Sequence, residues 1–300
     1  MSMDINIPDV ALVFEGGGMR ASYTAGFAVM LLENGLNFPK AYGISAGASH
    51  AVNYLSRDAA RTKASFVDLV NDPQFGGWRS FLRGEGYFNA HHLYEGIICE
   101  RRFPDEPMGF DFATFAANPA DCHIEAFDWE DGETIAWTKA DMLTPFDAGV
   151  RVRASSTMPI FMPPTPVEGR IFMDGGMGSS WGVCLDAALA DGFQRLVVVR
   201  TQERAYRKKE MGAAAQVAFR ALFRKHPLVA ENTIERWRHY NQLLDRIDAL
   251  EAEGRAFVFA PERMDITNRE TDFAILQATY ERGYNQANRE HERLTRWLQS

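Results

Sequence analysis

The chain has 300 residues and a formal net charge of −8, from 32 Lys plus Arg and 40 Asp plus Glu. Hydrophobic residues make up 46% of it, which is enough for a buried core and excludes a disordered or fibrous chain. The acidic balance argues against a protein that mainly coats nucleic acid, so we expect no nucleic-acid partner.

Three cysteines, Cys99, Cys122 and Cys184, are too few and too scattered for a disulfide framework or a CxxC metal site, and they fit a reducing compartment. The first ten residues lack the basic and apolar segments of a secretory signal. No apolar run approaches the roughly 18 residues that a membrane span needs. These features predict a cytoplasmic globular protein that could still contact a membrane from the aqueous side.

The first sixty residues contain two strand–turn–helix units. A short apolar strand over 11–14 stops at three glycines, and apolar residues at helical spacing then continue to Asn34. A second strand over 41–44 is followed by a helix of small residues over 46–55. Two such units in succession predict a parallel sheet covered by helices.

The middle of the chain mixes loops, a hairpin and short strands. Residues 71–90 are rich in glycine and aromatic residues and predict a long loop, after which Asn89 opens a helix. Residues 122–129 and 133–138 predict a hairpin. Farther along, we expect one helix and two strands, over 146–155, 170–173 and 196–199.

From 203 to 253 the composition is helical and highly charged, and a strand over 257–259 and a closing helix over 271–296 follow. We interpret the charged segment as an insertion, because the strand after it needs a sheet to join. The expected organisation is a catalytic core at 9–202, a charged helical insertion at 203–253, and a returning strand and closing helix of the same domain at 254–300.

The sharpest motif is Gly43-Ile44-Ser45-Ala46-Gly47, between a predicted strand and a predicted helix. A serine at such a junction takes a strained turn, and glycines such as Gly43 and Gly47 let the chains approach closely. The Ser45 hydroxyl would then lie beside the first turn of a helix, whose N–H groups favour developing negative charge. The motif predicts a nucleophilic serine.

A second glycine-rich turn, Gly16-Gly17-Gly18, follows the first strand, and Arg20 comes soon after it. Three glycines let consecutive N–H groups point at one place, and Arg20 adds a fixed positive charge, as an oxyanion or phosphate site requires. A crowded strand-to-helix turn is one alternative. A dinucleotide site is another, because Gly16, Gly18 and Ala21 satisfy GxGxxA, although the second strand ends in the serine turn and not in a ribose-binding acid.

Asp174 ends a predicted strand and precedes two glycines, so it is a candidate base in an open pocket. The alternative is an aspartate that only caps a turn. A serine nucleophile needs a base, and no histidine lies in a late post-strand loop, where an ordinary serine hydrolase carries one. We therefore expect structural or solvated roles for His50, His91, His92, His123, His226, His239 and His291.

Taken in order, GGGMR at 16–20, GISAG at 43–47 and DGG at 174–176 resemble the three signatures of the patatin-like phospholipases. The stretch at 154–164 is similar to the segment that precedes the third signature in that family. The likeness runs from about residue 10 to 200, and the strand at Phe257 with residues 269–287 resembles the tail of the bacterial branch. The charged segment at 203–253 has no counterpart that we can place.

The resemblance implies a three-layer α/β/α sandwich with a mainly parallel central sheet and a C-terminal helical segment. It implies a Ser–Asp dyad without histidine, here Ser45 and Asp174, and hydrolysis of lipid acyl esters through an acyl-enzyme without a cofactor. Such an enzyme would act as a phospholipase A or a lysophospholipase-like esterase. The implied oxyanion hole consists of the backbone of Gly16, Gly17 and Gly18, supported by Arg20.

The substrate side is less specific in the sequence. Aromatic residues at 75–88 and apolar residues at 158–162 could line an acyl groove, contact a bilayer or pack on their own core. A basic cluster at 200–209 could meet anionic headgroups or form a solvated helix face. The chain has no HExxH, EF-hand spacing or Cys/His quartet, so we expect no metal site.

Two rival classes of function stay open. One is a serine hydrolase with the usual histidine that acts on small soluble esters. The other is a non-catalytic lipid- or nucleotide-binding module in which the serine turn is only architecture. The favoured interpretation has a lipid or acyl-ester substrate and peripheral membrane contact.

Overall fold

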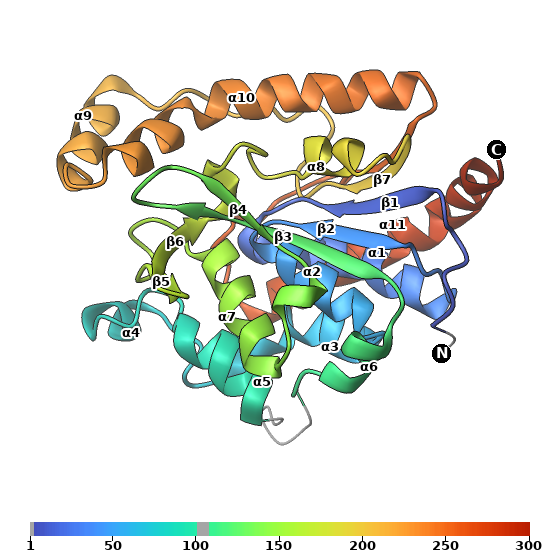
Figure 1. Cartoon of the computed structure of the whole chain (residues 1–300), viewed down its shortest axis with the longest axis horizontal. Coiled ribbons are helices and arrows are strands. Elements are labelled where there is room, and N and C mark those ends of the chain that lie inside the picture. The colour runs from blue at the N-terminus through green and yellow to red at the C-terminus, as the bar shows by residue number, and fades with distance from the viewer. Residues whose placement is uncertain (1–2, 101–107) are drawn as a thin grey trace.

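The computed structural model describes residues 3–100 and 108–300, and in these residues one eight-stranded sheet lies between two layers of helices (Figure 1). Five strands run parallel to one another: β1 (Val10–Phe14), β2 (Lys40–Gly43), β3 (Asp121–Asp128), β7 (Arg195–Val199) and β8 (Ala256–Phe259). Three pair antiparallel: β4 (Thr134–Trp137), β5 (Thr165–Val167) and β6 (Arg170–Asp174). The order is β5-β6-β3-β2-β1-β7-β8, and β4 pairs with β3.

The central strand β1 is buried along its whole length, and its side chains alternate between the two faces of the sheet. Val10, Leu12 and Phe14 belong to one apolar cluster, and Ala11 and Val13 belong to another. Because helices cover both faces, both sets of side chains must be apolar, which explains the unbroken apolar run in the sequence.

The helices form one layer on each face. On one side lie α1 (Ala21–Glu33), α2 (Ala46–Leu55), α7 (Pro145–Ser156) and the C-terminal α11 (Phe273–Gln299). On the other lie α8 (Leu185–Ala190) and α10 (Pro227–Ala252). The predicted three-layer α/β/α sandwich with a mainly parallel sheet and a C-terminal helix is therefore confirmed.

Shorter helices occupy the connections between these elements. They are α3 (Ala59–Ala64), α4 (Trp78–Leu82), α5 (Ile97–Glu100), α6 (Phe112–Ala117) and α9 (Ala213–Leu222). Just before α5, the chain forms a turn of π-helix over His92–Gly96. Such wide turns are often found at functional sites, and this one supplies side chains to the pocket described below.

Most predicted elements are present. The strands expected within 11–14, 41–44, 170–173, 196–199 and 257–259 all form, the hairpin forms as β3 and β4, and α2 has the predicted bounds. The prediction of one long loop over 71–90 was wrong at α4. The prediction of a helix that begins at residue 203 was wrong for residues 203–212. Hydrogen bonds to α10 hold this segment in a non-helical conformation. Lys208 N–H donates to Asn241 Oδ1 at 2.8 Å, and Asn241 Nδ2 donates to Lys208 O at 3.0 Å.

The returning strand β8 joins the sheet as expected, parallel to β7. How the chain divides into domains stays a prediction. Cys122 and Cys184 are buried free thiols, and the side chain of Cys99 lies outside the part that the structure describes. Among the described helices, none combines the length and the apolar character that crossing a membrane requires.

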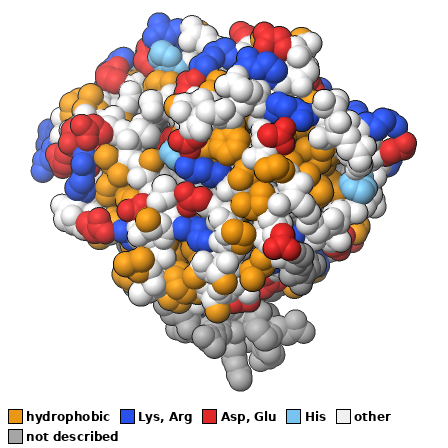
Figure 2. All heavy atoms as spheres, turned by 45° about the vertical axis from the view of Figure 1, so that its right-hand side comes forward, with side chains coloured by type: hydrophobic (Ala, Val, Ile, Leu, Met, Phe, Trp, Pro, Cys, Tyr) orange, Lys and Arg blue, Asp and Glu red, His pale blue; other side chains and the backbone are white. Residues whose placement is uncertain are grey.

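On the face that Figure 2 shows, acidic and basic side chains lie interspersed with hydrophobic ones. Charges of opposite sign also pair along α11, as Arg296 does with Glu292 at 2.7 Å. Charge of both signs in close alternation gives little long-range field of one sign on this face.

Candidate active site

The serine turn lies between β2 and α2. Ser45 has φ 57° and ψ −125°, a backbone conformation that side-chain-bearing residues rarely adopt. The flanking glycines are required by close approach: a Cβ on Gly43 would lie 2.1 Å from Gly47 O, and one on Gly47 would lie 2.3 Å from Phe14 O. The predicted strained turn with small neighbours is therefore what the chain forms here.

A buried serine of α7 holds this turn in place. Ser45 N–H donates to Ser155 Oγ at 2.9 Å, and Ser155 Oγ donates to Glu125 O at 2.6 Å. One hydroxyl therefore satisfies a buried donor on the turn and a buried acceptor on β3. The strained turn is linked through α7 to the middle of the sheet.

Asp174 is the last residue of β6, which runs antiparallel to β3. Gly43 pairs with Ile124 and Asp174 pairs with Ala126, so β2 and β6 end at nearly the same level on opposite sides of β3. This register brings the two turns together. Asp174 N–H donates to Thr157 O at 2.8 Å, directly after α7.

The Asp174 side chain also caps its own turn, since Gly176 N–H donates to Oδ1 at 2.7 Å. Burial raises the pKa of the Asp174 carboxyl above its ordinary value. The Arg236 charge and the Gly176 and Ser45 hydrogen bonds act in the opposite direction, without cancelling the effect of burial. The result is a carboxylate that is more basic than one in water and that lies near the Ser45 hydroxyl, whose effect is to lower its pKa.

One pocket collects most of the predicted site residues. Its lining includes Gly16, Gly17, Gly18, Arg20, Ser45 and Asp174. Gly43 and Gly47 do not line it, because they sit behind the serine turn, where their role is close packing. The structure also adds Thr233 and Arg236 of α10, which sequence reasoning did not identify.

The glycine-rich turn offers fewer free donors than the sequence suggests. Gly16 N–H donates to Gly182 O at 3.0 Å, and Met19 N–H donates to Asn268 O at 3.1 Å. Within the described chain, the N–H groups of Gly17 and Gly18 donate to no backbone or side-chain acceptor. Gly16 N–H is therefore already bonded, whereas the N–H groups of Gly17 and Gly18 are open among the described residues; that this turn forms an oxyanion hole stays a prediction.

Two of the cations near Asp174, Arg236 and Lys208, come from the charged segment. Arg236 Nε donates to Gly176 O at 2.6 Å, which places its guanidinium beside the Asp174 turn. Burial, with repulsion from Arg236 and Arg20, lowers the pKa of Lys208 to about 7. No local motif marks these positions, and only the packing of α10 on the sheet could have revealed them.

Arg20 lies beside a buried carboxylate. Burial lowers the pKa of Arg20, while the charge of Glu15 opposes this change. Glu15 accepts hydrogen bonds from the Tyr240 hydroxyl and from Thr201 N–H, the latter at 2.6 Å. This network fixes the first glycine-rich turn against β7 and α10.

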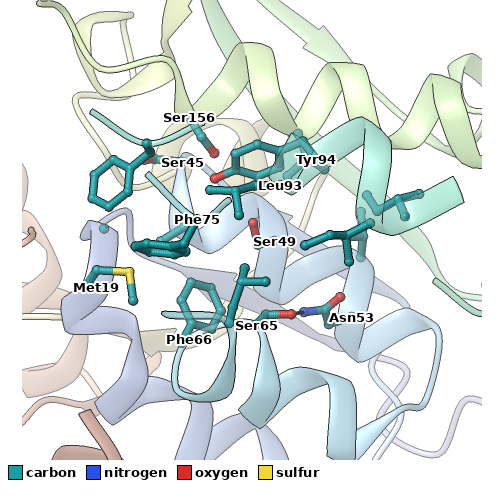
Figure 3. A pocket seen from close by; sticks show the side chains of 18 of the residues that line it. Met19, Ser45, Ser49, Asn53, Ser65, Phe66, Phe75, Leu93, Tyr94 and Ser156 are labelled. Atoms are coloured by element: carbon teal, nitrogen blue, oxygen red, sulfur yellow. Dashed lines mark hydrogen bonds between the residues drawn. The ribbon is translucent and has the colours of Figure 1, made fainter. Parts of the chain in front are cut away.

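A second, largely apolar pocket adjoins Ser45 (Figure 3). Its cavity volume is about 90 Å³, and its lining is mainly aromatic and aliphatic. Figure 3 shows Ser45, Ser156 and Tyr94 along its upper side and the aromatic rings of Phe66 and Phe75 below them. Of the predicted aromatic loop, Phe75 and Phe88 are buried and line this pocket, whereas Trp78 is exposed.

Among the described residues, no histidine lines either pocket. His50 is fully buried on α2, with its Nε2 2.9 Å from Thr24 Oγ1 and its ring 4.4 Å from that of Phe66. Burial lowers its pKa to about 3, so the ring is neutral. This arrangement weighs against a histidine as the base for Ser45.

The predicted basic cluster at 200–209 is not a free cationic surface. Arg200 is buried and donates to the carbonyls of Arg204 and Glu203 at 3.4 and 3.2 Å. Arg207 pairs with Asp245 and Asp248 of α10 at 3.0 and 2.9 Å. Arg207 therefore attaches the segment to α10, and the charge of Lys208 acts to lower the pKa of Asp174.

One group in the described residues has the side chains of a metal site, although the sequence predicts none. His123, Glu125 and Cys184 place their ligand atoms within 4.8 Å of one another. His123 Nε2 is 2.9 Å from Glu125 Oε1. Burial raises the pKa of the Cys184 thiol, which favours the protonated form and not the thiolate that binds metals.

Three comparisons with known proteins bear on this site. A family model described as patatin-like phospholipase matches residues 12–188, and a model described as a domain of unknown function (DUF6363) matches residues 226–299. The fold is similar to the crystal structure of VipD from Legionella pneumophila, with a TM-score of 0.51 and 13% identity over 97% of this chain and 67% of that one. No curated protein matches the chain.

Replacing Ser155 with Ala tests the link between the serine turn and the sheet. The change leaves the buried Ser45 N–H and Glu125 O without their partner. We expect a loss of about 1–3 kcal/mol in the free energy of unfolding, measured by urea titration. Ser22→Ala is the matched control, because Ser22 is buried and its Oγ has no hydrogen-bond partner in the described chain. Equal losses in both variants would contradict the proposed link.

Proposed function

The chain belongs to the patatin-like phospholipase family, and we propose that it hydrolyses lipid acyl esters with Ser45 as nucleophile and Asp174 as base. The observation that carries this proposal is the shared pocket, in which a strained serine turn and a half-buried carboxyl of raised pKa lie together. The adjoining apolar pocket supports an acyl substrate.

In the first half of the proposed reaction, Asp174 accepts the hydroxyl proton of Ser45 as Oγ attacks the ester carbonyl. The tetrahedral oxyanion collapses, the ester C–O bond breaks and the proton passes from Asp174 to the departing alcohol. The acyl group is then bonded to Ser45. The raised pKa of Asp174 supports its role as base, because a carboxylate of ordinary pKa would hold the proton weakly.

In the second half, Asp174 accepts a proton from water while the water oxygen attacks the acyl carbonyl. Collapse of the second intermediate releases the fatty acid, and the proton returns to Ser45. The unpaired N–H groups of Gly17 and Gly18 are the donors that we assign to both oxyanions, with Arg20 nearby as a fixed charge.

The charged segment has a role in this proposal. Arg236 and Lys208 lower the pKa of Asp174, which keeps the carboxyl ionised over a wider pH range. They also bring positive charge to the place where the reaction develops negative charge. Both cations lie over the ring of Tyr240, with Lys208 Nζ and Arg236 Cζ 5.4 and 5.8 Å from its centroid.

The rival classes of function are less well supported. A histidine base has no candidate in either pocket among the described residues. A dinucleotide site is less well supported because β2 ends in the serine turn and not in a ribose-binding acid. The cytoplasmic location and the absence of a nucleic-acid partner stay predictions from composition.

We further propose that the side of the molecule formed by α4, α9 and the 158–164 turn contacts the lipid surface. Trp78 and Leu82 of α4 are 69% and 84% exposed. An apolar groove beside them is lined by Phe81, Ile160 and Leu222, among others, and Met162 lines both this groove and the apolar pocket next to Ser45. Exposed large apolar side chains around a groove are suited to insertion among lipid headgroups.

Ser45→Ala and Asp174→Asn each test the dyad. We expect a loss of at least about 10³-fold in kcat/KM for p-nitrophenyl butyrate, because each change removes a group that acts in both half-reactions. A fluorophosphonate probe should label the parent protein and not Ser45→Ala. Ser179→Ala, at an exposed serine near the Asp174 turn, should keep full activity and labelling. Parent-like rates in either dyad variant would refute the assignment.

Arg236→Gln tests the electrostatic role of α10. Without this cation the pKa of Asp174 should rise further, because burial still acts on the carboxyl. Asp174 must be ionised to accept a proton, so the acidic limb of the pH profile of kcat/KM should move to higher pH. Arg238→Gln is the control on the same helix, because Arg238 is half exposed and pairs with Glu235 at 2.8 Å. An unmoved limb in Arg236→Gln would rule out this role.

The double variant Trp78→Ser with Leu82→Ser tests membrane contact. We expect partitioning onto vesicles of phosphatidylcholine and phosphatidylglycerol to fall at least about tenfold, because two large apolar side chains no longer insert. Hydrolysis of soluble p-nitrophenyl butyrate should be unchanged. Leu143→Ser with Phe146→Ser is the control, since these side chains are 75% and 50% exposed but lie at the start of α7, outside the proposed contact elements α4, α9 and 158–164. Equal loss of partitioning in both double variants would argue against a defined contact face.

A further inference from the structure

The apolar pocket beside Ser45 follows one face of α2. Ser45, Ser49 and Asn53 lie four residues apart and all line it, which is the spacing of side chains on one side of a helix. Figure 3 shows Ser45 on one side of the pocket, Asn53 on the opposite side and Ser49 between them. A chain bonded to Ser45 would therefore run along α2 toward Asn53.

The far end of this pocket is polar. Asn53 Nδ2 donates to Ser65 Oγ at 3.1 Å, and Asn53 Oδ1 accepts from Arg61 Nη1. All three residues line the pocket, and the Arg61 side chain is 7% exposed. The end of a purely hydrocarbon chain would contact this buried guanidinium without forming a hydrogen bond or an ion pair with it, which is energetically unfavourable.

The Arg61 charge is not paired with a carboxylate among the described residues. Its Nε donates to Met108 O at 3.1 Å, its Nη1 donates to Asn53, and its Nη2 donates to none of the described groups. Asp58 caps the start of α3 by accepting from the Arg61 backbone N–H at 2.8 Å, but it forms no ion pair with the guanidinium. A buried cation of this kind is normally matched by an anion.

The distance along α2 sets the size of the chain that fits. Eight residues separate Ser45 from Asn53, which corresponds to about 12 Å of helix. An extended, zigzag hydrocarbon with bonds of about 1.5 Å covers that length with roughly nine carbons. Longer chains would meet the Asn53–Arg61 end.

We propose that this pocket holds an acyl chain of about nine carbons whose far end carries a carboxylate, and that Arg61 and Asn53 bind that carboxylate. The inference rests on the proposed function, because it takes Ser45 as the site of acylation. The carboxylate would supply an anion to a guanidinium that pairs with none among the described residues, and it would accept from Nη2 and from the Asn53 amide. The substrate class is therefore an ester of a medium-chain dicarboxylic acid.

Competition binding tests the proposal without any need for hydrolysis. Monomethyl nonanedioate and methyl nonanoate differ only at the end that would meet Arg61. Each is used to displace a fluorescent fatty-acid analogue from the Ser45→Ala protein. We expect the nonanedioate ester to bind at least about tenfold more tightly. Equal affinities, or tighter binding of methyl nonanoate, would overturn the proposal before any pocket variant is made.

Arg61→Met in the same background should bring the two affinities to within about twofold of each other, because it removes the charge and keeps an apolar side chain of similar length. Lys63→Met is the matched control on α3, since Lys63 pairs with Asp68 at 3.8 Å and does not line the pocket; it should keep the preference. A preference retained in Arg61→Met would refute the assignment. If that variant does not fold, Arg61→Lys should keep part of the preference, and a complete loss there would count against a charge-based contact.

The same two esters with the catalytically intact protein separate this inference from the proposed function. Selective binding without hydrolysis would refute the catalytic proposal and leave the carboxylate site standing. Hydrolysis of both esters at equal kcat/KM, with equal binding, would refute the carboxylate site and leave the catalytic proposal standing.

Discussion

The candidate site depends on the C-terminal end of α7. Ser155 and Thr157, two residues apart at this end, form hydrogen bonds with the serine turn and with Asp174, which lie far apart in the sequence. Ser155 Oγ accepts from Ser45 N–H and donates to Glu125 O, and Thr157 O accepts from Asp174 N–H. These bonds satisfy buried polar groups of the serine turn, of β3 and of the Asp174 turn together. The strained backbone of Ser45 can persist because its neighbours fix it from several sides. Residues 154–158 therefore hold the backbone of both proposed catalytic residues in place.

Burial of Asp174 and two nearby cations, Arg236 of α10 and Lys208, have opposite effects on the pKa of its carboxyl. Removing a carboxyl from water raises its pKa, which suits a base but disfavours the ionised form, and Arg236 and Lys208 restore part of that ionisation. The cations themselves are partly desolvated, so Lys208 has a pKa of about 7 and its charge changes near neutral pH. A segment without a recognisable motif is thus electrostatically part of the site. It reaches the site because α10 packs across the face of the sheet opposite α2.

Two kinds of surface meet at Ser45. The pocket shared with Asp174 is lined by glycines and charged residues, whereas the pocket along α2 is lined mainly by aromatic and aliphatic side chains. A reacting ester placed between them would have its carbonyl in the polar pocket and its acyl chain in the apolar one. The polar Asn53–Arg61 end limits the length of the acyl chain that the second pocket can hold, as a simple acyl groove would not. This division follows from the position of Ser45 at the start of α2, between a turn and a helix face.

The sequence by itself determined the three turns and the layered fold. Three features depend on residue types at neighbouring positions, which a local sequence pattern records. They are the alternation of side chains along β1, the strained backbone of Ser45 and the close approach of the chain at Gly43 and Gly47. Only the tertiary structure decided that Gly16 N–H is occupied, that residues 203–212 lie along α10 without forming a helix, and that Arg61 closes a pocket. Those features are contacts between segments far apart in the chain. They follow from strand register and helix packing, and no spacing along a single segment encodes either one.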